Sequence, residues 1–329
     1  MNINPGKTQF TDAEHASLRD QVRSKMAGLG IAQAEVGRQA DVPGSTLSQY
    51  LSGTYTSEPG RTETATALTR WLKSIAVAED YGRQKPKTPA YLPLVGAQKI
   101  TAILQYARLT GDLVMIAGAP GVSKTSAARQ FQSDNPRTWY APMDSTITGA
   151  PTMLLEILAA MGHPDVKGPP NTLMRRICEL AAEATGLLII DEAQHLSDKG
   201  IEALRAINDR VGLGIAILGN EGAYAQVGVA GGKAAFAQVS SRFGHREYIV
   251  RPDPADAAQL AHAFANENGE EIGQREVAFC QEIAARAGGL RNVEKTFRKA
   301  LLAARGAREP FDLSHLQGAY AQLSGQAGR

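Results

Sequence analysis

Hydrophobic positions in the middle of the chain follow two periods in alternation. Short, continuous apolar runs of strand length are separated by longer segments with apolar residues at helical spacing. The runs predict strands over 112–117, 138–141, 187–191 and 213–218. The longer segments predict helices over 97–109, 124–133, 150–162, 170–184 and 198–208. Strands alternating with helices indicate an α/β core, a parallel sheet with helices on both faces.

The pattern differs on either side of this core. Residues 1–80 predict short helices with polar turns, the last one amphipathic around Leu68 and Trp71. Residues 81–95 contain three prolines and three basic residues, which is typical of an extended linker. Strands stop after the core, and helical spacing resumes. We therefore expect four parts: an all-α domain over 1–80, a basic linker over 81–95, the core over 96–252 and a small all-α domain over 253–329.

Composition is that of an ordinary globular protein. The 329 residues are 43% hydrophobic and 21% charged, with a net charge of +2, so contact with nucleic acid would have to come from local basic patches. Cys178 and Cys280 lie far apart, which argues against a disulfide framework or a zinc site. No apolar run has the length of a signal peptide or a membrane span. We expect a cytoplasmic protein without a membrane partner.

The run ending at Gly118 enters a loop with a second glycine, Gly121, and continues as a helix from Lys124. This is the strand–loop–helix of a P-loop, whose backbone amides and helix N-terminus hold phosphate. Lys124 can reach the β- and γ-phosphates of ATP, and the Thr125 hydroxyl can bind Mg²⁺. Ser123 stands where a glycine usually precedes the lysine; serine can make the turn if its φ stays negative, but its Cβ would crowd the loop. The nucleotide-binding residues predicted are Gly118, Ala119, Pro120, Gly121, Val122, Ser123, Lys124, Thr125 and Ser126.

A second motif places carboxylates at the end of a buried strand. Asp191 and Glu192 follow four apolar residues, about 65 positions after the P-loop. Asp191 is suited to the Mg²⁺ shell, and Glu192 to activating the attacking water. Asn220 ends the next strand near the expected γ-phosphate, unless it is only a turn residue. His195 is better explained as a helix-start or packing residue.

Two arginines complete the site candidates, Arg242 as a catalytic residue and Arg291 as a nucleotide-binding residue. Arg242 precedes the last expected core strand, where it could reach the nucleotide of a neighbouring subunit or could simply pair with a surface carboxylate. Arg291 begins a helix of the C-terminal domain, where it could contact phosphate or be a solvated helix start.

Residues 30–53 predict a helix, a short turn and a second helix. Val36, Leu47 and Tyr50 would form its core, and Gly37 would allow the helices to approach. This pattern resembles a repressor-type helix-turn-helix, whose second helix enters the major groove. A purely structural or protein-binding hairpin is the alternative. The candidate DNA contacts are Ser45, Thr46, Ser48 and Gln49, with linker residues Arg83, Lys85 and Lys87 as candidate phosphate contacts.

Together these motifs resemble the AAA+ ATPases. Gly118–Thr125 matches Walker A, Leu187–Glu192 matches Walker B, and Asn220, Arg242 and Arg291 match sensor 1, the arginine finger and sensor 2. The resemblance implies an AAA+ P-loop NTPase core with an all-α lid, using ATP and Mg²⁺ and forming a homo-oligomer, ring or filament, with ATP at subunit interfaces.

With the N-terminal helix-turn-helix, the chain is similar to the MuB-like family of transposition target-DNA activators and, in the string Asp191–His195, to the TnsC and TniB ATPases. That resemblance implies largely sequence-nonspecific binding of double-stranded DNA, delivery of that DNA to a DDE transposase, and stimulated ATP hydrolysis. Basic residues that could face the DNA are Arg175, Arg176, Lys199, Arg205 and Lys233.

Two other functions fit the same motifs. One is a replication or helicase-loader ATPase, which would bind a helicase in place of a transposase. The other is a transcriptional regulator that senses nucleotide without turning it over and binds one operator. A helicase with two motor domains fits poorly, because the chain has a single P-loop.

Overall fold

The structure is a computed structural model that describes residues 10–147, 149–182, 185–226 and 243–325. Contacts divide the chain into two units, one ending at Lys85 and the other beginning at Pro86. Each unit is described by itself. In the described residues, no helix combines the length and apolar character needed to cross a membrane.

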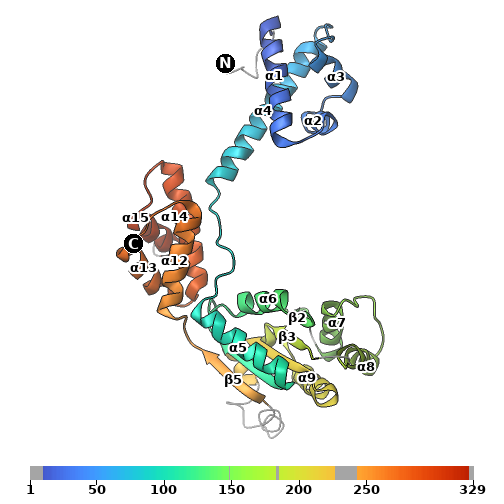
Figure 1. The fold of residues 1–329 in the computed structure, drawn as a ribbon, viewed down its shortest axis with the longest axis vertical. Coiled ribbons are helices and arrows are strands. Elements are labelled where there is room, and N and C mark those ends of the chain that lie inside the picture. Colours follow the sequence, from blue (N-terminus) through green and yellow to red (C-terminus); the bar gives the residue numbers. More distant parts are fainter. Residues whose placement is uncertain (1–9, 148, 183–184, 227–242, 326–329) are drawn as a thin grey trace. The chain divides into compact units, whose positions relative to one another are not determined.

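The first unit is all-helical: α1 (Asp12–Leu29), α2 (Gln33–Ala40), α3 (Gly44–Ser52) and α4 (Gly60–Gln84) (Figure 1). Thr11 and Glu14 form a capping box at the start of α1, and Gly30 ends that helix in the left-handed conformation. The apolar faces meet in one core that includes the expected Val36, Leu47 and Tyr50.

Helices α2 and α3 follow one another after a short turn, at the residues where the sequence predicts two helices. A Cβ at Gly37 would lie 2.9 Å from the Val42 carbonyl oxygen, so a larger residue there would push the turn away. Pro43 begins α3 as its N-cap, with extended backbone and no side-chain cap. The close crossing therefore depends on the glycine, as the sequence indicates.

The second unit is built on a parallel sheet of five strands in the order β2-β3-β4-β1-β5. The strands are β1 (Leu113–Gly118), β2 (Thr138–Pro142), β3 (Leu187–Asp191), β4 (Gly214–Gly219) and β5 (Phe243–Ile249). Strands β1, β3 and β4 are buried throughout because helices cover both faces. Their carboxyl ends lie at one edge, where ligands bind in open α/β sheets.

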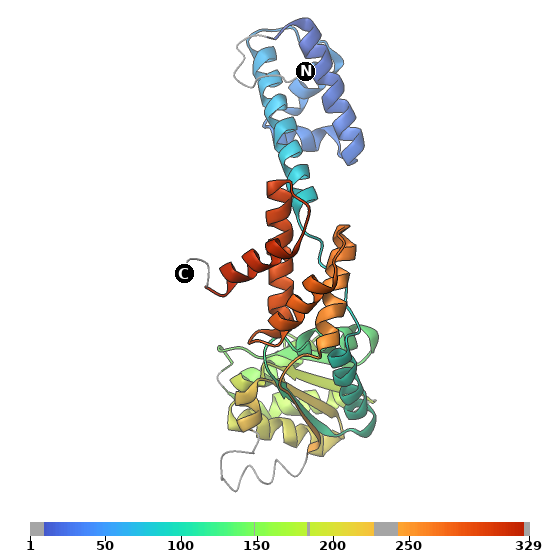
Figure 2. The same cartoon turned by 90° about the vertical axis from the view of Figure 1, so that its left-hand side faces the viewer.

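The helices of the core lie in two layers. Alternate residues of β1 belong to different core clusters: Val114 and Ile116 to the cluster that includes α5 and α6, and Leu113 and Met115 to the cluster that includes α7, α8 and α9. Helix α5, drawn in teal, runs along the strands (Figure 2). The elements of these layers are α5 (Val95–Thr110), α6 (Lys124–Asp134), α7 (Ala150–Ala160), α8 (Pro170–Ala181), η1 (Ala193–His195), α9 (Asp198–Val211) and α10 (Glu221–Gln226).

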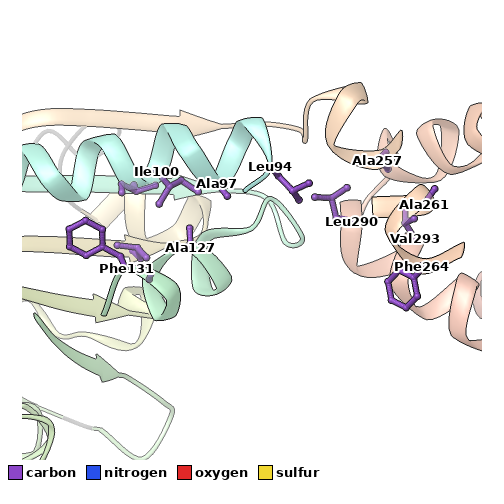
Figure 3. Close-up of a cluster of buried hydrophobic side chains, with 14 of the residues drawn as sticks. Leu94, Ala97, Ile100, Ala127, Phe131, Ala257, Ala261, Phe264, Leu290 and Val293 are labelled. Carbon is purple, nitrogen blue, oxygen red and sulfur yellow. The ribbon is translucent and has the colours of Figure 1, made fainter. Parts of the chain in front are cut away.

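A helical lid follows β5: α12 (Pro254–Asn268), α13 (Gln274–Ala284), α14 (Gly289–Ala307) and α15 (Leu313–Leu323). Its apolar core continues into that of the sheet, with Leu94 at the start of α5 near Leu290 of α14 (Figure 3). The buried Asp256 carboxylate accepts hydrogen bonds from the Val95 and Gly96 amides at 2.6 and 3.1 Å. The lid thereby caps the first core helix.

The segment expected as an extended linker over 81–95 departs from that expectation at both ends. Helix α4 continues through Gln84, so residues 81–84 are helical. The Lys87 amide donates to Asn268 Oδ1, and Asn268 Nδ2 donates to the Lys87 carbonyl, both at 2.9 Å. Residues 86–94 are thus bound to the lid, and they belong to the second unit.

Candidate nucleotide-binding site

The P-loop connects β1 to α6 at the carboxyl edge of the sheet. Any Cβ at Gly118 would overlap the Ile249 carbonyl oxygen, which accepts from the Ala119 amide at 3.0 Å. Gly121 has φ +81°, and a Cβ there would overlap the Gly288 carbonyl of the lid. These two glycines are required by close backbone contacts as well as by the turn.

Ser123 does not have the negative φ at which serine fits such a turn easily. Its φ is +68° and its ψ is 13°, the left-handed conformation that a glycine would adopt at low cost. Serine therefore preserves the shape of the loop, and its left-handed backbone is strained by about 1–2 kcal/mol relative to glycine. Its side chain makes no capping hydrogen bond to α6.

Lys124 points back along its own loop. Its Nζ donates to the carbonyl oxygens of Gly118 and Ala119 at 2.8 and 3.0 Å. Burial lowers the pKa of this lysine, an effect that the charges of Asp191 and Glu192 oppose. A buried ammonium held by neutral carbonyls is well placed to exchange them for phosphate oxygens.

Asp191 is the centre of a small polar network. Only 2% of its surface is exposed. Its Oδ2 accepts from the Thr125 hydroxyl at 2.7 Å and from the Tyr140 hydroxyl at 2.6 Å, and its Oδ1 accepts from the Glu192 amide at 2.8 Å. A hydroxyl beside a buried carboxylate is an all-oxygen donor set, which fits Mg²⁺.

Glu192 leaves the strand with φ +55° and is exposed. Gln194 Nε2 donates to its carboxylate, and Gln194 Oε1 accepts from the Asn220 amide at 3.3 Å. The Asn220 side chain accepts from the Ala223 amide at 3.2 Å and so caps α10. Asn220 is therefore both a cap and a lining residue of the site.

Lys124, Thr125, Glu192 and Asn220 line one cavity of about 670 Å³, a size typical of small-molecule sites. The lid closes one side, because the Leu290 amide donates to the Gly121 carbonyl at 3.0 Å. Arg291 lines the cavity, and its charge contributes to lowering the Lys124 pKa. Lining residues from the P-loop, Walker B and sensor motifs are Gly118, Pro120, Gly121, Val122, Ser123, Lys124, Thr125, Ser126, Glu192, Asn220 and Arg291.

Several lining residues were not anticipated. Thr88 to Leu92 form part of the wall, although their composition indicates a spacer. Arg129, one turn after Thr125 on α6, also lines the cavity. Tyr140, which is connected to the site through its hydrogen bond to Asp191, was also missed. A tyrosine within a short strand resembles a core residue, and its strand, unlike β3, does not end in a polar motif. The helical spacing of Thr125 and Arg129 is the one signal that could have indicated Arg129.

The remaining candidates lie elsewhere. On α3, Ser45, Ser48 and Gln49 are exposed and Thr46 is half-buried. His195 ends η1, exposed and apart from the lining residues. Arg242, Lys233 and the Arg83 side chain are outside the described residues, and Lys85 and Lys87 are exposed.

The basic candidates on the core helices are mostly paired. Arg175 and Arg176 lie 3.8 and 3.3 Å from Glu179, and Arg205 lies 3.1 Å from Glu202. Lys199 is exposed at the start of α9. Exposed pairs of this kind are weak and would compete little with a phosphate.

The parallel sheet, the P-loop, the strand-end carboxylates and the lid define a P-loop ATPase of the AAA+ class. A family model for the AAA domain matches residues 107–227. The ORC2 protein of Aeropyrum pernix has the same fold, at 16% identity and a TM-score of 0.55 over 72% of this chain and 69% of that one. The predicted fold class is confirmed.

Within that class the chain is similar to the Mu B transposition proteins. Residues 241–323 match the family model of the Mu B transposition protein, C terminal. Over 94% of this chain and 95% of the other, it is 28% identical to the ATP-dependent target DNA activator B of Escherichia phage Mu. It is 27% identical to the Mu-like prophage FluMu DNA transposition protein B of Haemophilus influenzae, over 85% of this chain and 95% of that one. The resemblance expected from the sequence is confirmed.

Proposed function

We propose that this ATPase is an ATP-dependent target-DNA activator: with ATP and Mg²⁺ bound it assembles on double-stranded DNA, largely without sequence preference, and delivers that DNA to a DDE transposase. The observation that carries the proposal is a complete P-loop site in a chain that also has a separate helix-turn-helix unit. Relatives similar over both units bear the names of target DNA activators.

ATP would occupy the cavity between the P-loop and the lid. Lys124 would leave the carbonyls of Gly118 and Ala119 for the phosphates, and Arg291 would approach them from α14. Thr125 and Asp191 would hold Mg²⁺, whose charge would stabilise the transferring phosphoryl group. Because Leu290 bonds directly to Gly121, a change in the P-loop is transmitted to the lid through the backbone.

Glu192 would act as the general base for the attacking water. In the present arrangement Gln194 holds its carboxylate, so the base must be released before hydrolysis. Arg242, which we expect to act on the nucleotide of a neighbouring subunit, would make turnover depend on oligomerisation. Hydrolysis would then weaken the subunit contacts and release the DNA.

Contact with DNA would come first from α3. Its exposed Ser45 and Ser48 have short hydroxyl side chains, and the helix carries no basic residue in its last turn. Serine hydroxyls hydrogen-bond phosphates or either base without specifying a sequence, and of the exposed candidates on α3 Gln49 alone could make a bidentate contact, with adenine. This favours binding to arbitrary duplexes over binding to one operator.

The test is binding of the full chain to random-sequence linear duplexes of increasing length, with and without ATP. We expect ATP-dependent, cooperative binding, its loss in Lys124→Ala, and persistent complexes in Glu192→Gln. Addition of the cognate transposase should raise the ATPase rate of the wild type. Tight binding to a single site without turnover would support a transcriptional regulator instead, and stimulation by a helicase alone would support a loader.

A further inference from the structure

Tyr140 is a buried tyrosine whose hydroxyl belongs to the nucleotide site. It lies in the middle of β2, opposite Ile189 of β3, and 8% of its surface is exposed. The hydroxyl donates to Asp191 Oδ2 at 2.6 Å.

The hydroxyl shares its acceptor with a candidate ligand of the cation. Asp191 Oδ2 also accepts from Thr125, whose hydroxyl oxygen would bind the cation and can keep donating its proton to the carboxylate. Tyr140 and the Glu192 amide also hold the carboxylate, one on each oxygen, and neither of them would bind the cation. Tyr140 thus fixes the rotation of the Asp191 carboxylate independently of the ligand.

The tyrosine is itself held from the cavity side. The guanidinium carbon of Arg129 lies 4.6 Å from the centre of the Tyr140 ring, over its face. Arg129 lines the cavity from α6, one turn beyond Thr125. The Tyr140 ring is therefore held between the sheet and the Arg129 guanidinium.

From this arrangement we infer that Tyr140, supported by Arg129, is a positioning residue for the divalent cation: it orients Asp191 to receive Mg²⁺ with the nucleotide. The inference rests on the proposed function of the site. It goes beyond that proposal by assigning a role to a side chain outside the P-loop, Walker B and sensor motifs.

The experiment is a Mg²⁺ titration of the full-length Tyr140→Phe variant, read by binding of a fluorescent ATP analogue. Removing a hydrogen bond to a ligating carboxylate costs metal affinity about 10–100-fold. We therefore expect the half-saturating Mg²⁺ concentration to rise by about that factor. Nucleotide affinity in EDTA should stay within about twofold of the wild type, since Tyr140 touches Asp191 and not the P-loop.

Tyr106→Phe is the matched control. Its hydroxyl donates to Asp112 Oδ2, also at 2.6 Å, away from the lining residues of the cavity. This variant should show the wild-type Mg²⁺ dependence, and melting temperatures of both variants report on folding. Arg129→Ala should shift the Mg²⁺ dependence in the same direction as Tyr140→Phe.

Three results would overturn the inference, and they are distinguishable. An unchanged Mg²⁺ dependence in Tyr140→Phe would remove the role of Tyr140 and leave the proposed function intact. An equal loss of nucleotide affinity with and without Mg²⁺ would show that the tyrosine only supports the fold of the site. Failure of the wild type to bind ATP at any Mg²⁺ concentration would refute the proposed function itself.

Discussion

Replacing Ser123 with glycine should stabilise the ATPase unit. Serine in the left-handed conformation costs about 1–2 kcal/mol, and glycine avoids that cost. Glycine also gives the unfolded chain more freedom, which costs about 0.5–1 kcal/mol in return. The net gain in unfolding free energy should be about 0.5–1 kcal/mol, or about 1–4 °C in melting temperature for a unit of this size.

The assay is thermal unfolding of the full chain. The transition to follow is the one whose melting temperature rises when ATP is added. Arg308→Gly is a matched control, because Arg308 has φ +59° at the end of α14, apart from the cavity. It should stabilise the protein similarly without altering nucleotide affinity. Ser123→Val should destabilise, since a β-branched side chain tolerates a positive φ poorly. If Ser123→Gly melts below the wild type, or Ser123→Val melts with it, the account of Ser123 as strained is wrong.

Three further outcomes test other parts of the structure. Gly121→Ala should displace the lid and weaken ATP binding at least tenfold in equilibrium titration, because its Cβ would overlap the Gly288 carbonyl. Gly212→Ala, with φ +60° but open space around it, should spare binding, and equal losses in the two variants would contradict the lid contact. Arg291→Ala should lower ATP affinity about 10–100-fold, as expected for one lost charged hydrogen bond, without changing the melting temperature. Arg298→Ala, on the same helix but paired with Glu294, should leave ATP affinity unchanged. A wild-type affinity in Arg291→Ala would make Arg291 a surface residue. Burial, and then the charge of Arg61, lowers the pKa of His15, so the unfolded chain binds the proton more readily than the folded one. The unfolding free energy of the first unit, measured in urea, should therefore be highest above pH 6.5 and fall as the pH drops below it. The His15→Gln variant should lack this pH dependence.

The fold could be predicted because its elements have strong local signals. Buried parallel strands such as Leu187–Asp191 are continuous apolar runs, and the helices between them have clear spacing and caps. The extent of α4 could not be read in the same way. Its last turns are polar and lead directly into a proline-containing segment, so composition hides the point where the helix ends.

The site was predictable where chemistry is concentrated in consecutive residues. Lys124, Thr125, Asp191 and Glu192 follow strand ends, and the sheet brings strand ends together. Tyr140 joins them through a side chain in the middle of a strand, a relation that depends on the register of β2 against β3. No pattern along one strand determines that register, because it is set by packing.

The hydrogen bonds between Lys87 and Asn268 determine where a truncated form of this ATPase should begin. A truncation that begins at residue 96, where the α/β pattern starts, would remove Thr88 to Leu92 and leave one wall of the cavity open to water. It would also delete Val95, whose amide is held by Asp256. A fragment beginning at Pro86 retains all of these contacts, so it should keep the nucleotide site of the intact protein while lacking the DNA contacts proposed for α3.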